Sequence, residues 1–365
     1  MMTFIAHIRQ KTGRNMEDSD HCHSVDNTGG RSYSICHFMR IWPCLLFAIL
    51  APISVVSGPA KANEIRADTA VKITSAAPRS AQNPVFSPDG KRILYTRFLH
   101  GYNRGPSELV MVGIDGRHER ILVPASGADN VNVPYGSWVG NRICFASDRV
   151  GDGDEIWILK DDGSDMRQVT NHSDDEDVFF IEPVFNPRNN NQIAFEYVHG
   201  RSEKNAIHRI AYLDVSTGRV KLLTDGQFDD RLPSWSSDGQ KLLFQRNKYG
   251  QNDGWDVFFA KITVSGNISL GRLRQVFHGK TEYTDCSWGP KDKSILCSSP
   301  FGALDIPNIW NFPLSNKVDA RPVTQSRTAE DSAPSASPNG EYVAFESHFG
   351  DDEKRPSEIW IIETN

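Results

Sequence analysis

The sequence predicts an all-β protein: a six-bladed β-propeller with four antiparallel strands in each blade. Two observations predict it. A segment that ends in a tight turn recurs about every 50 residues. The last repeat lacks its fourth strand, and a matching strand precedes the first repeat. Because six repeats account for nearly all of residues 63–365, we assign one propeller domain to that range.

The tight turns define the first two strands of each repeat. Residues 84–90 read Pro-Val-Phe-Ser-Pro-Asp-Gly, and residues 233–239 and 334–340 are close copies. An apolar strand follows each turn, as expected for a β-hairpin. Weaker copies lie between these three. One aligned position just before the turn carries mostly large aromatic residues: Phe86, Trp138, Phe185, Trp235, Trp288 and Ala336.

A third apolar segment and a short fourth strand complete the repeat. The fourth strand ends in an apolar residue followed by Thr at 169–170, 223–224 and 323–324. Residues 71–74, Val-Lys-Ile-Thr, match this ending but precede the first repeat. We therefore expect residues 71–74 to pair with residues 358–362 and so complete the last blade, which would remove an exposed sheet edge.

The motifs resemble those of a known family. The Ser-Pro-Asp-Gly turn, Ser147-Asp148-Arg149 leading to Ile156-Trp157, and the ending at 167–170 are similar to TolB-type propeller repeats over the whole of the predicted domain. TolB itself carries an α/β domain ahead of its propeller, and we expect this chain to lack it. Similar repeats are found in periplasmic binding proteins, oligogalacturonate lyases and prolyl oligopeptidases, so the resemblance implies a fold and leaves function open.

Residues 1–62 read as an N-terminal extension with a secretory signal peptide. An apolar run at 41–57 follows Arg40 and ends near Ala60-Lys61-Ala62, which predicts cleavage after Ala62. Met39, directly before Arg40, is the predicted true start. A membrane anchor is the alternative, but the run is short and contains prolines. We expect a periplasmic or secreted protein with no stable membrane span after cleavage.

Charge and cysteine content bound the remaining function classes. The formal net charge of −6 disfavours a nucleic-acid partner. Beyond residue 62 the cysteines are Cys144, Cys286 and Cys297, and an odd number argues against a disulfide framework. Cys286 and Cys297 flank a predicted hairpin turn, so they either pair in an oxidising compartment or remain buried thiols.

The two faces of the propeller are predicted to differ. One face carries short turns, whereas the other carries long loops between the second and third strands, and long loops on a rigid scaffold usually hold binding residues. The position just past each second strand points toward that loop-rich face and includes Arg97, Tyr197 and Arg246. Arg97 and Arg246, three blades apart, would clamp an anionic ligand, unless each is simply paired with a neighbouring carboxylate.

Acidic and histidine residues gather at the same face. Acidic runs that include Asp230 and Asp331 precede first strands, where a cation such as calcium would relieve their repulsion; solvated surface charge is the alternative. No cofactor is otherwise predicted. His100, His199 and His348 fall in equivalent loops, where they either share a site or are ordinary surface residues.

Two functions are consistent with these features. We expect a noncatalytic module, monomeric and exported, that binds a protein or cell-envelope partner on its loop-rich face. The alternative is a carbohydrate-active lyase or hydrolase that acts on an anionic oligosaccharide at the channel mouth. No catalytic motif such as Gly-x-Ser-x-Gly is present.

Overall fold

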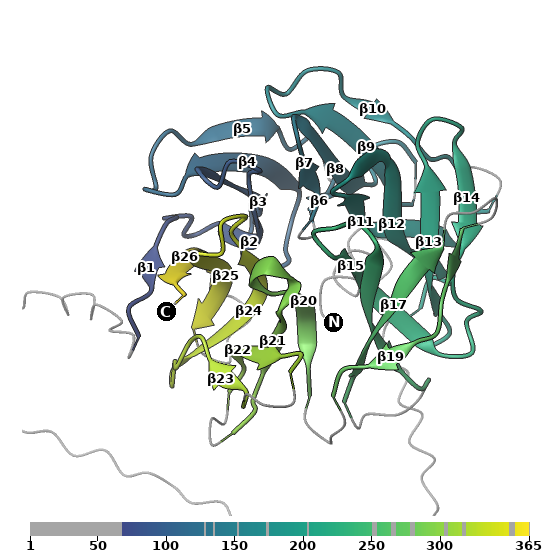
Figure 1. Ribbon diagram of the computed structural model, residues 1–365. Coiled ribbons are helices and arrows are strands. Elements are labelled where there is room, and N and C mark those ends of the chain that lie inside the picture. Colours follow the sequence, from purple (N-terminus) through teal and green to yellow (C-terminus); the bar gives the residue numbers. More distant parts are fainter. Residues whose placement is uncertain are drawn as a thin grey trace, which may run out of the picture. The chain divides into compact units, whose positions relative to one another are not determined.

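Six antiparallel sheets are arranged as blades around a common centre (Figure 1). The computed structural model describes residues 68–364 apart from 128, 134–135, 152, 173–174, 203, 250–253, 264–267, 278–281, 303–305, 316–318 and 350–354. Within this part of the chain one short 3-10 turn, η1 (Pro290–Asp292), interrupts the strands. The prediction of an all-β, six-bladed propeller is confirmed. The predicted start at Met39 and cleavage after Ala62 lie outside the described residues.

Blades 1 to 3 follow one another along the chain. Blade 1 contains β2 (Ser80–Phe86), β3 (Arg92–Phe98), β4 (Ser107–Gly113) and β5 (Arg120–Val123). Blade 2 contains β6 (Val131–Asn132), β7 (Trp138–Val139), β8 (Arg142–Ser147), β9 (Glu155–Lys160) and β10 (Arg167–Gln168). Blade 3 contains β11 (Val178–Asn186), β12 (Asn189–His199), β13 (Ile207–Asp214) and β14 (Arg219–Leu222).

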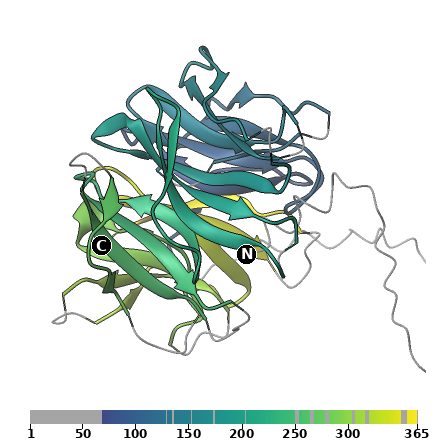
Figure 2. The same cartoon turned by 90° about the vertical axis from the view of Figure 1, so that its right-hand side faces the viewer.

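Blades 4 to 6 complete the ring, and Figure 2 shows them in green and yellow beside the blue and teal blades 1 to 3. Blade 4 contains β15 (Asp229–Trp235), β16 (Lys241–Asn247), β17 (Asp256–Thr263), β18 (Ser269–Leu270) and β19 (Arg274–Gln275). Blade 5 contains β20 (Thr284–Trp288), β21 (Ser294–Ser299), β22 (Asn308–Pro313) and β23 (Arg321–Pro322). Blade 6 contains β24 (Ala329–Ala336), β25 (Tyr342–Phe349), β26 (Glu358–Glu363) and, from the start of the described chain, β1 (Val71–Lys72).

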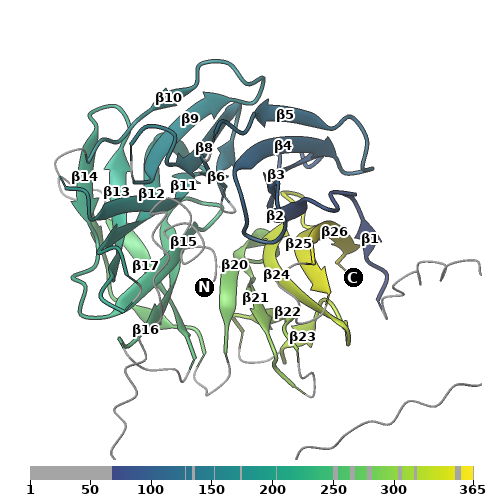
Figure 3. The ribbon, with the colours of Figure 1, turned by 180° about the vertical axis from the view of Figure 1, so that it is seen from behind.

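The ring closes through β1, which lies beside β26 (Figure 3). Val71 pairs with Ile361 and Lys72 with Trp360, so the predicted pairing of 71–74 with 358–362 is confirmed. Thr74 strengthens the closure: its Oγ1 accepts a bond from the N–H of Ile359 (2.9 Å) and donates one to Oε2 of Glu358 (2.5 Å). Thr74, Glu358 and Ile359 are buried, so these hydrogen bonds are shielded from water, whereas Val71 and Lys72 are exposed.

The apolar-Thr ending that marked the repeats has the same role in other blades. Thr170 Oγ1 accepts the N–H of Ile156 and donates to Glu155, and Thr324 Oγ1 accepts the N–H of Ile309 and donates to Asn308. Each threonine thus ties the end of the outer strand to the start of the third strand. Because the hydroxyl must both accept and donate a hydrogen bond there, Thr recurs at the end of the outer strand.

The tight turns are held by a repeated side-chain network. Ser87 Oγ donates to Asp89 Oδ1 (2.5 Å) and accepts the N–H of Arg92 (2.9 Å), while Gly90 adopts a left-handed φ of 69°. Equivalent bonds join Ser236 to Asp238 and Ser337 to Asn339. The Ser-x-Asp/Asn-Gly sequence therefore satisfies the turn locally, as such residues commonly do.

The aromatic column of the repeat fills the interfaces between blades. Trp138 of blade 2 is 4% exposed and lies under the Arg92 guanidinium of blade 1, 5.0 Å from the ring centroid. Lys241 of blade 4 lies over Trp288 of blade 5 in the same way, at 5.4 Å. A large buried ring and a cation from the neighbouring blade therefore recur around the ring.

Cys286 and Cys297 form a disulfide between β20 and β21, and Cys144 is a buried free thiol. The first of the two alternatives left by the sequence is therefore correct. The bond crosslinks the inner two strands of blade 5.

Closure can be tested with Thr74→Val. The variant keeps the shape of the side chain but leaves the Ile359 N–H without its acceptor and removes one bond to the Glu358 carboxylate, which still accepts the N–H of Ala76. This should reduce the free energy of unfolding by about 1–3 kcal/mol. Urea or thermal unfolding of residues 63–365 measures the change. Val71→Thr is the control, because Val71 lies three residues before Thr74 and is 58% exposed. Equal stabilities for Thr74→Val and wild type would contradict the assigned role.

The disulfide predicts a thiol count. Residues 63–365, purified from an oxidising compartment and denatured, should react with a thiol reagent at one cysteine, Cys144, and at three after reduction. Three reactive thiols before reduction would show that Cys286 and Cys297 are not bonded.

Candidate functional site

The inner strands carry a repeated backbone bulge. One residue on the inner strand of five blades has a left-handed φ of 49–54°, and the pairing with the second strand shifts register there: Asn83, Glu182, Leu232, Asp285 and Ala333. Non-glycine residues rarely adopt such angles, and bulges of this kind redirect side chains. Since the inner strands surround the centre of the ring (Figure 1), the bulges set the chemistry of the channel.

Four of the five bulges are supported by one repeated position of the preceding blade, and at Glu182 that position is Ala146. This repeated position of the second strand, directly before that of Arg97 and Arg246, sends a side chain across to the inner strand of the following blade. Glu346 Oε2 accepts the N–H of Asn83 (2.8 Å), and Gln245 Oε1 accepts the N–H of Cys286 (2.9 Å). Three further contacts repeat the arrangement: Thr96 to Val133, Glu196 to Leu232 and Ser298 to Asp331.

Three carboxyl groups from different blades interact across the channel: Glu182, Asp285 and Glu346. Burial raises the pKa of Glu182 to about 8, and the charges of Glu196 and Asp285 add to the effect. Burial likewise raises the pKa of Glu346 to about 7, with Asp285 contributing, although the Asn83 N–H opposes the shift. Both groups therefore titrate near neutral pH, as is common at functional sites.

A loop of blade 1 reaches over to this group. Tyr102 donates a hydrogen bond to Oε1 of Glu346 (3.2 Å), and its ring lies 4.7 Å from that of His348. Ser332 also donates to the same Glu346 oxygen (3.0 Å). Burial raises the pKa of Tyr102, so its phenol remains a donor at neutral pH.

A second buried pair stands next to the channel group. His208 Nδ1 lies 2.6 Å from Oε1 of Glu196, and both side chains are almost fully buried. Burial alone would raise the pKa of Glu196, but the hydrogen bond and the charge of His208 outweigh it, so the pKa is lowered. Glu196 therefore stays ionised beside Glu182, whose proton it helps to retain.

The structure pairs both predicted arginines with carboxylates of their own blades. Arg97 bonds to Glu108 (Nε, 2.7 Å) and Glu119 (Nη1, 2.5 Å) and is 3% exposed. Arg246 forms a two-point bond to Asp230 at 2.6 and 2.9 Å. The alternative of simple pairing is thus the arrangement observed, and the two arginines are not brought together in a clamp.

The remaining predicted residues are dispersed. Asp331 accepts a bond from Ser347 (2.7 Å), and Tyr197 lines a groove between blades 2 and 3. The ring of His348 packs against that of Tyr102, whereas His100 is exposed and His199 lies 3.6 Å from Asp175. The structure therefore does not show the three histidines as one cluster. Among the described residues, no group of three or more His, Cys, Asp or Glu is placed to hold a metal ion.

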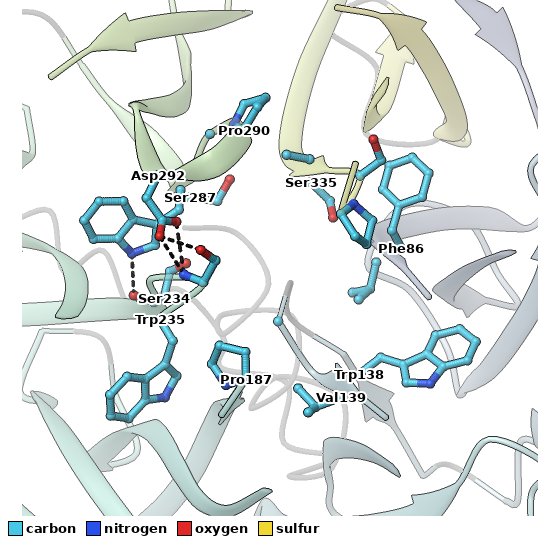
Figure 4. Close-up of a pocket in the computed structure, with 18 of the residues that line it drawn as sticks. Phe86, Trp138, Val139, Pro187, Ser234, Trp235, Ser287, Pro290, Asp292 and Ser335 are labelled. Carbon is cyan, nitrogen blue, oxygen red and sulfur yellow. Dashed lines mark hydrogen bonds between the residues drawn. The ribbon is translucent and has the colours of Figure 1, made fainter. Parts of the chain in front are cut away.

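A cavity of about 240 Å³ lies at the other end of the channel, on the tight-turn face (Figure 4). All six blades line it. Ser234, Ser287 and Ser335 come from equivalent positions of blades 4 to 6, and Val85 occupies that position in blade 1. Asp292 of η1 accepts bonds from the N–H and hydroxyl of Ser237, which fixes one side of the rim. A cavity therefore exists on the face where the sequence predicted short turns.

Comparison with known families identifies the repeat. The profile of the TolB beta propeller domain matches residues 61–292. The chain belongs to the TolB β-propeller family. Comparison with curated proteins gave no match.

Solved structures share the TolB-type propeller fold at low sequence identity. An oligogalacturonate lyase from Vibrio parahaemolyticus has a TM-score of 0.53 at 13% identity, over 82% of this chain and 96% of that one. TolB from Acinetobacter baumannii gives 0.51 at 17%, over 80% and 65%, so this chain spans about two thirds of that protein. A putative TolB from Agrobacterium tumefaciens gives 0.52 at 14%, over 81% and 97%. These likenesses show the fold alone.

The carboxylates in and beside the channel were not predicted from the sequence. Glu196 and Glu346 stand inside apolar second strands at one repeated position, which is a visible signal, since buried strands seldom carry unpaired carboxylates. Glu182 and Asp285 gave no signal, because only the bulge turns them toward each other.

Over the described residues, no helix is long and apolar enough to cross a bilayer.

The raised pKa of Glu182 predicts how stability depends on pH. The folded state holds this proton up to about pH 8, whereas the ordinary pKa of a glutamate is 4.5, so the stability contribution is complete below about pH 4.5 and is lost as the pH rises toward 8. Glu182→Gln keeps the acceptor for Asn132 and cannot ionise. We expect its melting temperature to fall less than that of wild type between pH 5 and about 8. Parallel pH dependences for the two proteins would contradict the assignment.

Proposed function

We propose that this TolB-family chain is an exported, noncatalytic module that binds a protein or cell-envelope partner on its loop-rich face. The apolar run at 41–57 supports export to the periplasm or beyond. The propeller supplies a rigid ring on which that face is displayed. Arg97 and Arg246 are each paired with a carboxylate of their own blade, which is consistent with a structural role for both arginines.

An ordered acidic segment on this face carries the proposal. The side chains of Asp175, Glu176 and Asp177 are 53%, 86% and 56% exposed. Their backbone is nevertheless fixed: the N–H of Gly200 bonds to the carbonyl of Asp177 (2.7 Å), and Arg201 holds the Asp177 carboxylate (2.9 Å). Exposed charge on a fixed backbone suits recognition, because little conformational entropy is lost on binding.

The expected partner presents basic residues. Carboxylates at the rim of a face act mainly by steering a complementary surface and by excluding wrong partners. Association should therefore be faster at low ionic strength and should weaken as salt screens the charges.

One observation favours the alternative, a carbohydrate-active enzyme. Glu182 and Glu346 have pKa values of about 8 and about 7, so either would carry an exchangeable proton near neutral pH, as a general acid must. They lie in the channel, away from the acidic segment.

The proposal is tested by capture of a partner from envelope extract with residues 63–365 immobilised, followed by quantitative binding of the partner recovered. Glu176→Lys reverses the most exposed charge of the segment and should weaken binding about tenfold or more, mainly by slowing association. Glu363→Lys is the matched control: it makes the same charge change at an exposed site at the tight-turn end of β26 and should bind as wild type does.

Two outcomes would overturn the proposal. One is equal weakening by both substitutions, which would indicate a general charge effect. The other is recovery of no partner together with turnover of an anionic oligosaccharide, with or without divalent metal, that Glu346→Gln abolishes. The second outcome would establish the enzyme instead.

A further inference from the structure

The cavity on the tight-turn face (Figure 4) is lined by all six blades, and two of its lining residues depart from the repeat. One is Ala336 of blade 6, and the other is Lys291 in η1 of blade 5. In the close copies of the repeat both positions carry residues that serve the fold. The two departures line one cavity in adjacent blades, so they indicate what the cavity holds.

Ala336 leaves the aromatic column one ring short. The other five members line the cavity and are buried, each with 1–7% of its surface exposed: Phe86, Trp138, Phe185, Trp235 and Trp288. Ala336 is only partly buried, so the space that a ring fills in the other blades is open to the cavity at blade 6. Around the ring this gap falls between Trp288 of blade 5 and Phe86 of blade 1, which contact blade 6 through their inner strands.

The size of the cavity suits a single ring. An apolar cavity of about 150 Å³ holds a benzene molecule. Drug-sized ligands occupy pockets of about 300 Å³ or more. With a volume of about 240 Å³, the cavity accommodates one six-membered ring with a short polar substituent and excludes an oligosaccharide.

Hydroxyl groups line the cavity beside this gap. Ser287 Oγ donates to the carbonyl of Pro334 (2.8 Å) and is therefore used by the fold. Over the described residues, the hydroxyls of Ser234 and Ser335 have no hydrogen-bond partner, although each residue is only 7% exposed. Two free hydroxyls in a confined space can donate hydrogen bonds to a ligand that carries acceptor atoms.

Lys291 supplies a cation at the rim of the cavity. In the three close copies of the turn the same position carries an acid or amide that is bonded to the serine of its own turn: Asp89, Asp238 and Asn339. Blade 5 has Gly289 in place of that serine, so the local network is absent. Within the described part of the chain, Lys291 forms no ion pair.

The charged groups around Lys291 are already bonded elsewhere. Asp292, also a lining residue, accepts bonds from the N–H and hydroxyl of Ser237 in blade 4, at 2.7–3.0 Å. Arg188 of blade 3 also replaces the turn acid, but its Nε donates to the Ser237 carbonyl (3.1 Å). Lys291 is therefore the charged lining residue that no described group neutralises.

The turn that carries Lys291 is held beside blade 6 in an uncommon conformation. The φ angles are 56° at Lys291 and 55° at Asp292, and the three close copies place a glycine at the second of these positions. Non-glycine residues seldom adopt such angles, and strain of this kind is concentrated at ligand sites. Pro290 packs against the blade 6 turn, since a Cβ added to Gly340 would fall 3.0 Å from its Cβ.

We propose that the cavity on the tight-turn face binds a monocyclic aromatic carboxylate. Its ring takes the place that Ala336 leaves in the aromatic column, and its carboxylate pairs with Lys291. A planar ring packs well against the tryptophan and phenylalanine rings of the neighbouring blades. The site is on the opposite face from the acidic segment, so it stands whether or not the proposed partner binding is correct.

Isothermal titration calorimetry of the purified protein with four probes tests the proposal. Benzoate should bind with a Kd below about 1 mM, as expected for a ligand of this size. Benzamide keeps the ring without the charge, and cyclohexanecarboxylate keeps the charge without the planar ring; each should bind at least about threefold more weakly than benzoate. Acetate should not bind measurably.

Two substitutions assign the two parts of the site. Lys291→Gln should weaken benzoate about three- to tenfold and leave benzamide unchanged, because it removes the cation alone. Ala336→Phe supplies the missing ring from the chain itself and should abolish binding of both probes. Thermal melts check that each variant is folded.

Lys293→Gln is the matched control, because Lys293 lies two residues after Lys291, is exposed and does not line the cavity. It should bind benzoate as wild type does. The proposal is overturned if wild type does not bind benzoate below about 1 mM, or if folded Ala336→Phe binds it as tightly as wild type. It is also overturned if Lys291→Gln and Lys293→Gln have equal effects, or if cyclohexanecarboxylate or acetate binds as tightly as benzoate.

Discussion

The propeller depends on satisfying the backbone of its inner strands from the neighbouring blade. A left-handed bulge in an inner strand exposes an N–H or carbonyl that its own sheet does not pair, and a buried unpaired group is costly. The preceding blade supplies the partner, as Glu346 does for Asn83 and Gln245 for Cys286. This dependence recurs at five of the six blade junctions, including the junction of blades 6 and 1. Closure by β1 is therefore part of the same constraint.

The same constraint creates the electrostatics of the channel. A side chain that reaches the next blade must be polar, and in blades 3 and 6 it is a carboxylate, Glu196 or Glu346. The bulges add Glu182 and Asp285 to the same confined space, where burial and mutual repulsion raise the pKa values of Glu182 and Glu346. Titratable groups in the channel are thus a consequence of how the blades are joined, and binding or catalysis would use a feature that the fold already requires.

Residues that depart from the repeat are better candidates for function than residues that follow it. Positions that follow the repeat, such as Thr74 and Thr170 or Ser87 and Ser236, make the same bonds in each blade and serve the fold. Arg209 occupies a position where the other blades carry an acceptor, and among the described residues its Nε is buried without a hydrogen-bond partner. Arg97 and Arg246 were candidates for binding an anionic ligand, yet each is paired with a carboxylate of its own blade. In a repeat protein, the unmatched residue is more informative than the reactive one.

The sequence by itself determined the fold, the number of blades and the pairing of residues 71–74 with 358–362. Those follow from local patterns that repeat: a turn whose hydrogen bonds lie within a few residues, an alternation of apolar strands, and a threonine that marks the end of a blade. The tertiary structure decided which polar groups meet. Glu182, Asp285 and Glu346 are far apart in the chain and come together through bulges that the sequence pattern does not reveal. The pairing of Arg97 with Glu119 joins residues 22 positions apart. Interactions between distant residues are set by the closed ring, and a reading of one repeat at a time does not contain them.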